Sequence, residues 1–140
     1  MSMSKKMYTR NDVEMQRYHP PGRYVGYITA WRKDVANTGT EFIVFSLKAR
    51  EGLSGQDLKG VELNRELTSR RFYLSEAAIK QYWTAVQNAC PEWLDKLEEE
   101  FSEEDAAELL VGAEVEFDYT PEKNKTTGKE YLNVQRWKKA

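Results

Sequence analysis

The two stretches that decide the fold are residues 37–42, NTGTEF, and residues 126–131, TTGKEY. Each carries Thr-Gly, one further residue, then Glu and an aromatic residue, and an aliphatic residue follows both copies. Glycine supplies the positive φ that a tight turn requires, and such a turn between alternating apolar runs is the usual signal of a β-hairpin. The sequence therefore predicts two β-hairpins, one in each half of the chain.

Strands are predicted on both sides of each turn, and one more lies between the hairpins. The predicted strands are 22–33, 41–50, 69–75, 113–120 and 129–137, with a further short one near 61–67. Within them, apolar and polar residues alternate with the period of two that is typical of a half-buried strand. Gly26 lies inside the first strand, where glycine often marks a bend or a bulge.

The stretch between the third strand and the second hairpin is predicted to be helical. Ser75 is a good N-cap, apolar residues follow at helical spacing as far as Ala89, and Pro91 interrupts the helix. A second amphipathic segment comes next, and Ser102 is expected to cap a third short helix that Gly112 ends. Two or three helices are therefore expected here.

Strand-strand-strand-helix-strand-strand is the element order of a five-stranded OB-fold barrel, β-β-β-α-β-β, whose outer face binds oligonucleotides or oligosaccharides beside its hairpin loops. We therefore expect a mainly β fold with a helical insert between strands 3 and 4. Residues 1–21 hold four basic residues before a Pro-Pro-Gly breaker and are expected to form a flexible basic N-terminal arm. Residues 22–140 are expected to form one OB-fold domain, with the insert at about 75–110.

The composition argues against a membrane protein, a secreted protein and a zinc-binding protein. With 140 residues, 40% of them hydrophobic and 31% charged, the chain resembles an ordinary soluble domain, and it has no apolar run long enough for a membrane span or a secretory signal. One cysteine and one histidine cannot form a zinc cluster. We expect no metal, no cofactor and a cytoplasmic location, which would be the host cytoplasm if the source is viral.

The charge is distributed unevenly along the chain. Residues 91–108 hold nine acids and one base, so this acidic insert carries −8, and a net charge of −2 leaves +6 on everything else. Such segregation hints at a polyanionic ligand. The insert itself has three interpretations: a solvated helix face whose apolar stripe closes the barrel, an acidic surface that repels DNA from one side and so orients the strand, or a docking site for a basic replication or recombination protein.

The outward faces of the predicted strands combine aromatic rings with cations. If Ile28, Phe45, Phe117 and Val134 point into the barrel, alternation turns another set of side chains outward. Unpaired bases stack on aromatic rings, and Lys and Arg neutralise phosphates, so such a surface suits single-stranded nucleic acid of any sequence. The candidate nucleic-acid-binding residues are Tyr27, Trp31, Arg32, Lys33, Phe42, Lys48, Arg70, Arg71, Tyr73, Lys123, Lys125, Lys129, Tyr131 and Trp137. The alternative is that some of these rings pack under the helices or against a second copy of the chain in a homodimer.

The runs PPGRYVGYITAW (20–31), TGTEFIVFSL (38–47), RRFYLSEAAIKQYWTAVQNA (70–89), VGAEVEFDYT (111–120) and GKEYLNVQRW (128–137) together resemble small bacteriophage-type single-stranded DNA-binding proteins associated with recombination. The resemblance implies an OB barrel that coats single-stranded DNA in replication or recombination. It also implies that Trp31, Phe42, Tyr73 and Tyr131 stack bases. The chain departs from the better-known bacterial type because it ends in QRWKKA rather than in a glycine-rich linker with an acidic tip.

Two other classes of function compete with DNA binding. A nuclease would need carboxylates that converge on Mg²⁺, and Glu114, Glu116 and Asp118 alternate on one strand face beside Lys129 and Glu130. A protein-interaction module, for example a viral inhibitor of a host complex, would use the outward rings and the acidic insert. We expect a non-enzymatic, sequence-tolerant single-stranded DNA-binding protein, with RNA as the alternative ligand.

Overall fold

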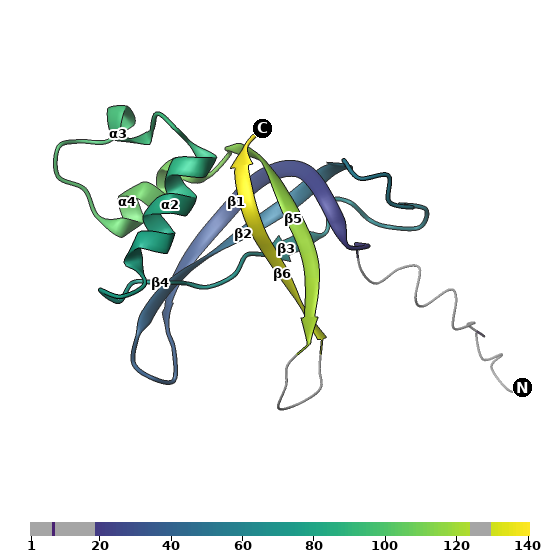
Figure 1. Ribbon diagram of the computed structural model, residues 1–140, viewed down its shortest axis with the longest axis horizontal. Helices are drawn as coiled ribbons and strands as arrows, with labels where there is room; N and C mark the ends of the chain where they lie inside the picture. Colours follow the sequence, from purple (N-terminus) through teal and green to yellow (C-terminus); the bar gives the residue numbers. More distant parts are fainter. Residues whose placement is uncertain (1–6, 8–18, 124–129) are drawn as a thin grey trace, which may run out of the picture.

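A computed structural model describes residues 7, 19–123 and 130–140 and gives a mainly β fold with helices between the strands (Figure 1). The elements are β1 (Gly22–Val35), β2 (Glu41–Gly52), β3 (Glu66–Thr68), β4 (Phe72–Tyr73), α2 (Ile79–Ala89), α3 (Trp93–Lys96), α4 (Glu103–Leu110), β5 (Glu114–Lys123) and β6 (Glu130–Lys139). The predicted mainly β class and the position of the helical insert are confirmed.

The strands form one antiparallel sheet in the order β3-β2-β1-β5-β6, and β4 pairs with the other end of β2. Strand β1 is central, because it pairs with β2 along its length and with β5 over its first six residues. The two ends of this order, β3 and β6, come together at an isolated parallel bridge between Ser69 and Val134, where the Arg70 amide donates to the Val134 carbonyl over 3.3 Å.

The predicted third strand, 69–75, is reduced to the two-residue β4, and β3 overlaps the end of the further short strand predicted near 61–67. The sheet therefore has six strands rather than the five of the predicted barrel. The interruption lies at residues 69–71, between β3 and β4. The Ser69 hydroxyl accepts a hydrogen bond from the Phe45 amide over 2.9 Å and donates to the Arg70 carbonyl over 2.8 Å. These bonds satisfy backbone groups where regular strand pairing stops.

The core lies between the sheet and the helices. Figure 1 shows the helices gathered on one side of the strands. Ile28, Phe45, Phe117 and Val134 are all buried there, as alternation predicts. Helix α2 contributes Tyr82 and other apolar residues to the same core, and α4 contributes Leu110. One contiguous core of this kind is consistent with a single domain.

The strand pairing has three register shifts. One lies between Val25 and Gly26, where the predicted irregularity is confirmed, and the other two are bulges that change which residues face this core. In β1, the register passes from Ile28–Leu47 to Ala30–Ser46, so Thr29 has no partner on β2. In β6, Arg136 and Trp137 together face Phe117, and Arg136 has φ of 54°. An extra residue reverses the alternation beyond it, so each bulge turns the later part of its strand over.

Helix capping follows the prediction at one helix and departs from it at another. Ser102 caps α4 in a capping box with Asp105, as expected. Ser75 does not cap α2, which begins at Ile79 after a turn of residues 75–78 without a side-chain cap. In this turn the Ser75 carbonyl instead accepts the amides of Ala78 and Ile79.

The chain before β1 packs on the body from His19 onwards. His19 is buried against the rings of Tyr24 and Tyr119, and the Tyr24 hydroxyl donates to the Pro20 carbonyl over 2.6 Å. The predicted arm before His19, apart from Met7, lies outside the described residues. Within the described part, no helix is both long and apolar enough to cross a membrane.

Candidate nucleic-acid interface

The side of the sheet that faces away from the core carries several of the predicted binding residues. Strand pairing sets Tyr27 beside Lys48, Arg32 beside Val44, and Phe42 beside Tyr73. All of them lie on the side of β2 opposite to Ile43, Phe45 and Leu47, which are in the core. We call this surface the outer β2 face and define it by Tyr27, Arg32, Phe42, Lys48, Arg71 and Tyr73.

Two tyrosines supply the open rings of the outer β2 face. Tyr27 is 42% exposed and Tyr73 is 36% exposed, so both rings are accessible to a flat partner. Lys48 is half-buried next to Tyr27, with Glu66 of β3 on its other side in the register. These side chains lie where the sequence predicted them.

Phe42 faces outward as predicted, but its ring is covered. It is only 2% exposed because the Arg71 guanidinium carbon lies 4.3 Å from the centre of its ring and Tyr73 meets it edge-on at 5.8 Å. The expectation that Phe42 offers an open stacking surface is therefore wrong. The flat group available at this position is the Arg71 guanidinium, which the ring holds by a cation–π contact.

Trp31 and Lys33 do not belong to the outer β2 face, and the expectation that Trp31 points outward is wrong. The bulge at Thr29 turns both residues towards α4, where the Trp31 indole N–H donates to Glu108 over 2.6 Å. Lys33 binds Glu104, and its Nζ lies 3.1 Å from Glu41. These hydrogen bonds raise the pKa of Lys33 and keep its charge engaged.

Trp137 is the second ring that a bulge turns inward. It is 5% exposed, its indole N–H donates to the Ala85 carbonyl over 2.8 Å, and it packs against Phe45 and Phe72. The expectation that Trp137 lies outside the barrel is wrong, since the left-handed conformation of Arg136 reverses the strand just before it.

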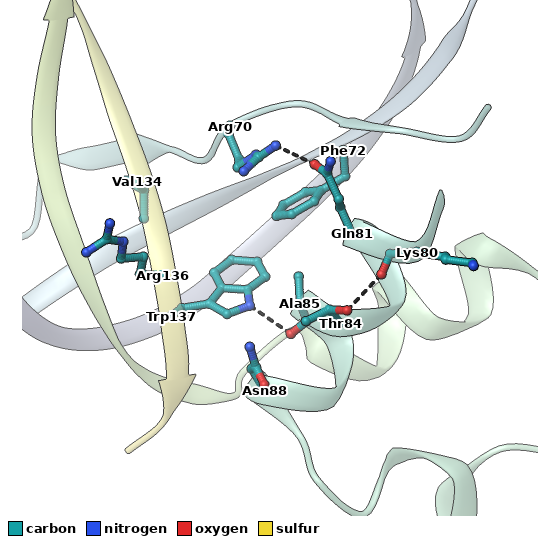
Figure 2. A pocket seen from close by; sticks show the side chains of 10 residues that line it. All are labelled: Arg70, Phe72, Lys80, Gln81, Thr84, Ala85, Asn88, Val134, Arg136 and Trp137. Atoms are coloured by element: carbon teal, nitrogen blue, oxygen red, sulfur yellow. Dashed lines mark hydrogen bonds between the residues drawn. The ribbon is translucent and has the colours of Figure 1, made fainter. Parts of the chain in front are cut away.

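Arg70 points to a different surface from its neighbour Arg71. Its guanidinium lies over the Phe72 ring and donates to Gln81 Oε1 over 2.6 Å (Figure 2). It overlooks a groove of about 450 Å³ between α2 and β6. The residues that line this α2–β6 groove are Arg70, Phe72, Lys80, Gln81, Thr84, Ala85, Asn88, Val134, Arg136 and Trp137.

Most cations with described side chains, Arg65 apart, fall into two groups. One group lies within 4 Å of a carboxylate: Arg23, Arg32, Lys33, Arg50, Lys96, Lys138 and Lys139. The other group has no such ion pair among the described residues: Lys48, Lys59, Arg70, Arg71, Lys80 and Arg136. Apart from Lys59, every member of this second group lies on the outer β2 face or lines the α2–β6 groove.

Sequence reasoning missed the part that α2 plays in the groove. Lys80, Thr84 and Asn88 recur at a spacing of four on the helix, and α2 contains no acidic residue. This polar stripe without acids could have been read from the sequence, because residues four apart lie on one helix face.

Four predicted binding residues have no described side chain. Lys125 and Lys129 lie outside the described residues, as does most of the turn between β5 and β6. Lys123 and Tyr131 belong to β5 and β6 by backbone, but their side chains are outside the described part. Their roles in binding remain predictions.

The three carboxylates that alternate along β5 are each engaged by a cation. Glu114 pairs with Arg50 at 2.7 Å, Asp118 pairs with Arg23 at 2.9 Å, and Glu116 lies 3.7 Å from Lys138. In the described ranges, three or more His, Cys, Asp or Glu side chains nowhere come together as a metal site would require.

The acidic insert is partly tied to the rest of the fold. Glu104 and Glu108 bind side chains of β1, and Glu92 lies 3.7 Å from Lys139 of β6. Trp93 is buried, where it stacks on Trp83 with ring centres 5.5 Å apart. Residues 98–100, three consecutive glutamates, are exposed.

Comparison with known proteins adds no relative. A scan of the sequence against protein-family models finds no match, and a search of curated proteins finds none either. The resemblance to bacteriophage-type single-stranded DNA-binding proteins therefore stays a prediction.

Proposed function

We propose that the sheet is an OB-fold barrel in which β3 and β4 together play the part of the third strand. The order of elements supports this, since the helices lie between that strand and the last hairpin. The central position of β1 and the parallel bridge between Ser69 and Val134 also fit, because such a contact joins the two ends of the sheet.

We further propose that the protein binds single-stranded DNA on the outer β2 face with little dependence on sequence and without catalysis. The observation that carries this proposal is the coincidence of open rings, Tyr27 and Tyr73, with cations that have no carboxylate partner in the described part, Lys48 and Arg71. Cations already held by carboxylates would have to break those pairs before binding phosphate. Among the described residues, Lys48 and Arg71 have no such pair to break.

Each side chain has a distinct part in this proposal. Tyr27 and Tyr73 stack on bases, which is worth roughly 1–3 kcal/mol for each base. Lys48 and Arg71 neutralise phosphates and release counterions. Arg71 also presents a flat guanidinium that Phe42 holds in place at 4.3 Å, and an arginine plane is itself a surface on which a base can stack.

The test is a fluorescence anisotropy titration of labelled oligo-dT, oligo-U and duplex DNA with the full chain. Oligo-dT should bind and duplex DNA should bind far more weakly, and the affinity should fall steeply as salt rises from about 50 to about 300 mM. Tyr27→Ala and Arg71→Gln should each weaken oligo-dT binding by at least about fivefold. Tighter binding of oligo-U than of oligo-dT would assign the ligand as RNA.

The matched control for Arg71→Gln is Arg50→Gln. Both changes remove one exposed arginine, but Arg50 is already paired with Glu114 at 2.7 Å. Arg50→Gln should therefore change the affinity by less than about twofold. Equal losses in the two variants would mean that only net charge matters, and the outer β2 face would lose its assignment.

One observation favours the alternative, a protein-interaction module. Leu94 is 58% exposed on the same insert as the three exposed glutamates at 98–100, and an apolar side chain beside acids suits a basic, partly apolar partner. The same titration separates the two functions. Failure of every nucleic acid to bind, even at low salt, would leave partner binding as the better explanation.

A further inference from the structure

The α2–β6 groove is a second surface with unpaired positive charge, and the outer β2 face does not include it. Arg70, Lys80 and Arg136 border it, and its lining includes no carboxylate. None of the three has a carboxylate within 4 Å in the described part of the chain. Three uncompensated cations around one groove repel each other, so an anion that binds among them is favoured.

The lining indicates what kind of anion fits. A groove of about 450 Å³ lies within the usual range for small-molecule sites, roughly 300–1,000 Å³, and is larger than a lone phosphate needs. Phe72, Ala85, Val134 and Trp137 give it an apolar floor, while Gln81 and Asn88 bring amide groups. An apolar floor accepts the flat face of a base, and amides match the donors and acceptors on its edge.

The connection at residues 69–71 joins the groove to the outer β2 face. Arg71 reaches to one side of it, over Phe42, and Arg70 reaches to the other side, over Phe72. Phe42 lies outside the core cluster and Phe72 belongs to it, so the two guanidinium groups serve different surfaces. A nucleic-acid strand bound at Arg71 would therefore reach Arg70 next.

We propose that the α2–β6 groove holds one nucleotide of the single strand that crosses the outer β2 face. Arg70 contacts its phosphate, its base lies on the apolar floor, and Asn88 contacts the base edge. Lys80 and Arg136, whose side chains extend away from the groove in Figure 2, add to the attraction at long range. This inference rests on the proposed DNA binding and extends it to a second surface.

The experiment measures affinity against length of oligo-dT for the full chain and two groove variants. Arg70→Gln removes the phosphate contact, and Asn88→Trp fills the groove from an exposed helix position without changing charge. The unaltered chain should gain at least about tenfold in affinity once the oligonucleotide is long enough to reach the groove. Both variants should lose that gain and should keep the affinity for shorter oligonucleotides within about twofold.

Lys59→Gln is the matched control, because Lys59 is exposed, has no ion pair in the described part and lies away from both surfaces. It should leave the gain with length in place. Thermal melting of each variant checks the fold, and if one groove variant fails to fold, the other still gives the answer.

A second readout is the indole N–H resonance of Trp137, which reports on the groove wall. Long oligo-dT should shift it, and the resonance of Trp93, a buried residue of the acidic insert, should stay in place. Thymidine monophosphate is the probe for a free nucleotide. Saturation of the groove by that probe at the affinity of long oligo-dT would overturn the strand assignment in favour of a free nucleotide.

The outcomes separate the two proposals. If the unaltered chain binds oligo-dT and the groove variants bind every length as it does, the groove proposal is wrong and the outer β2 face keeps its assignment. If the unaltered chain binds no oligonucleotide at low salt, the proposed function fails and the groove proposal fails with it.

Discussion

Arg71 is held over Phe42, so this phenylalanine should matter for binding although it cannot touch a base itself. Phe42→Leu keeps an apolar side chain but removes the ring. An exposed cation–π contact is worth about 0.5–1 kcal/mol, so oligo-dT affinity should fall by roughly two- to fivefold. The salt dependence should stay the same, because no charge is removed. Anisotropy titrations at two salt concentrations measure both quantities.

The control for this change is Val35→Ala, which alters an exposed apolar residue near the same turn. It should leave affinity and salt dependence unchanged. A reduced salt slope in Phe42→Leu would contradict the idea that the ring only positions the guanidinium.

His19 should make the stability depend on pH. Burial lowers the pKa of His19 from its ordinary value of 6.5, and nearby Arg65 adds to this, although a hydrogen bond to the Leu63 carbonyl opposes it. Below pH 6.5 the unfolded chain therefore takes up a proton before the folded chain does. The free energy of unfolding should fall with decreasing pH, with a slope of at most about 1.4 kcal/mol per pH unit from this group.

Urea denaturation at pH 7.5 and at lower pH measures this effect. His19→Gln cannot take up the proton, so its unfolding free energy should vary less over the same pH range. Identical pH profiles in the two proteins would show that His19 does not contribute.

Phe117 is the residue whose loss should harm the core most directly. It is fully buried in β5 and stacks on Tyr24 with ring centres 6.0 Å apart. Phe117→Ala should lower the free energy of unfolding by about 3–5 kcal/mol, since it leaves a cavity. Tyr27→Ala, on the outer face, should cost less than about 1 kcal/mol, and chemical denaturation compares the two. Similar losses would mean that Tyr27 is structural.

At the scale of elements, regular strands and the irregularity at Gly26 could be predicted from the sequence, but the bulges at Thr29 and Arg136 could not. In β5 the residues Val115, Phe117 and Tyr119 face the core as alternation predicts. In β1 and β6 alternation fails beyond Thr29 and Arg136, and it fails for Trp31 and Trp137 in particular. Neither bulge residue is a glycine or an asparagine, so nothing local marks the extra residue.

Gly26 gives an element-scale prediction. A Cβ at this position would lie 2.0 Å from the Lys48 carbonyl oxygen and 2.9 Å from the Ala49 Cα, both backbone atoms that cannot move aside cheaply. Gly26→Ala should therefore destabilise the protein by more than about 2 kcal/mol, because β1 and β2 would have to separate. The free energy of unfolding from chemical denaturation is the measurement.

Gly39→Ala is the comparison for this change. Gly39 has φ of 86° at the hairpin turn, and a Cβ there would meet nothing within 4 Å. Its replacement should cost only the strain of the left-handed backbone, about 1–2 kcal/mol. A larger loss at Gly39 than at Gly26 would contradict the close approach of the two strands.

At the scale of the whole molecule, the negative charge of the acidic insert lowers the electrostatic potential around the binding surfaces. Changing the three glutamates at 98–100 to glutamine moves the net charge from −2 to +1 without touching a buried contact. Oligo-dT affinity should rise by about two- to fivefold at low salt, and the gain should vanish at high salt because exposed charges are screened. A loss of affinity would indicate that these glutamates contribute to the site.

The sequence allowed the element order, the helical insert and much of the core to be predicted, because these follow from local pattern. It did not allow the α2–β6 groove to be predicted, since that groove depends on which helix face meets which strand. Tertiary contacts also decide which cations form ion pairs with carboxylates and which do not. Lys33 and Arg71 are both basic residues of predicted strands, but among the described residues only Lys33 meets carboxylates.

The isolated bridge between Ser69 and Val134 also has a thermodynamic consequence. A junction made by so few bonds is the place where the two ends of the sheet separate at the lowest free energy, so the Arg70 amide should exchange its hydrogen faster than the amides of central β1. A nucleotide in the groove would contact Arg70 on one side of this junction and β6 on the other, and would hold the two ends of the sheet together. Occupancy of the groove and closure of this junction would then be linked, and each would stabilise the other.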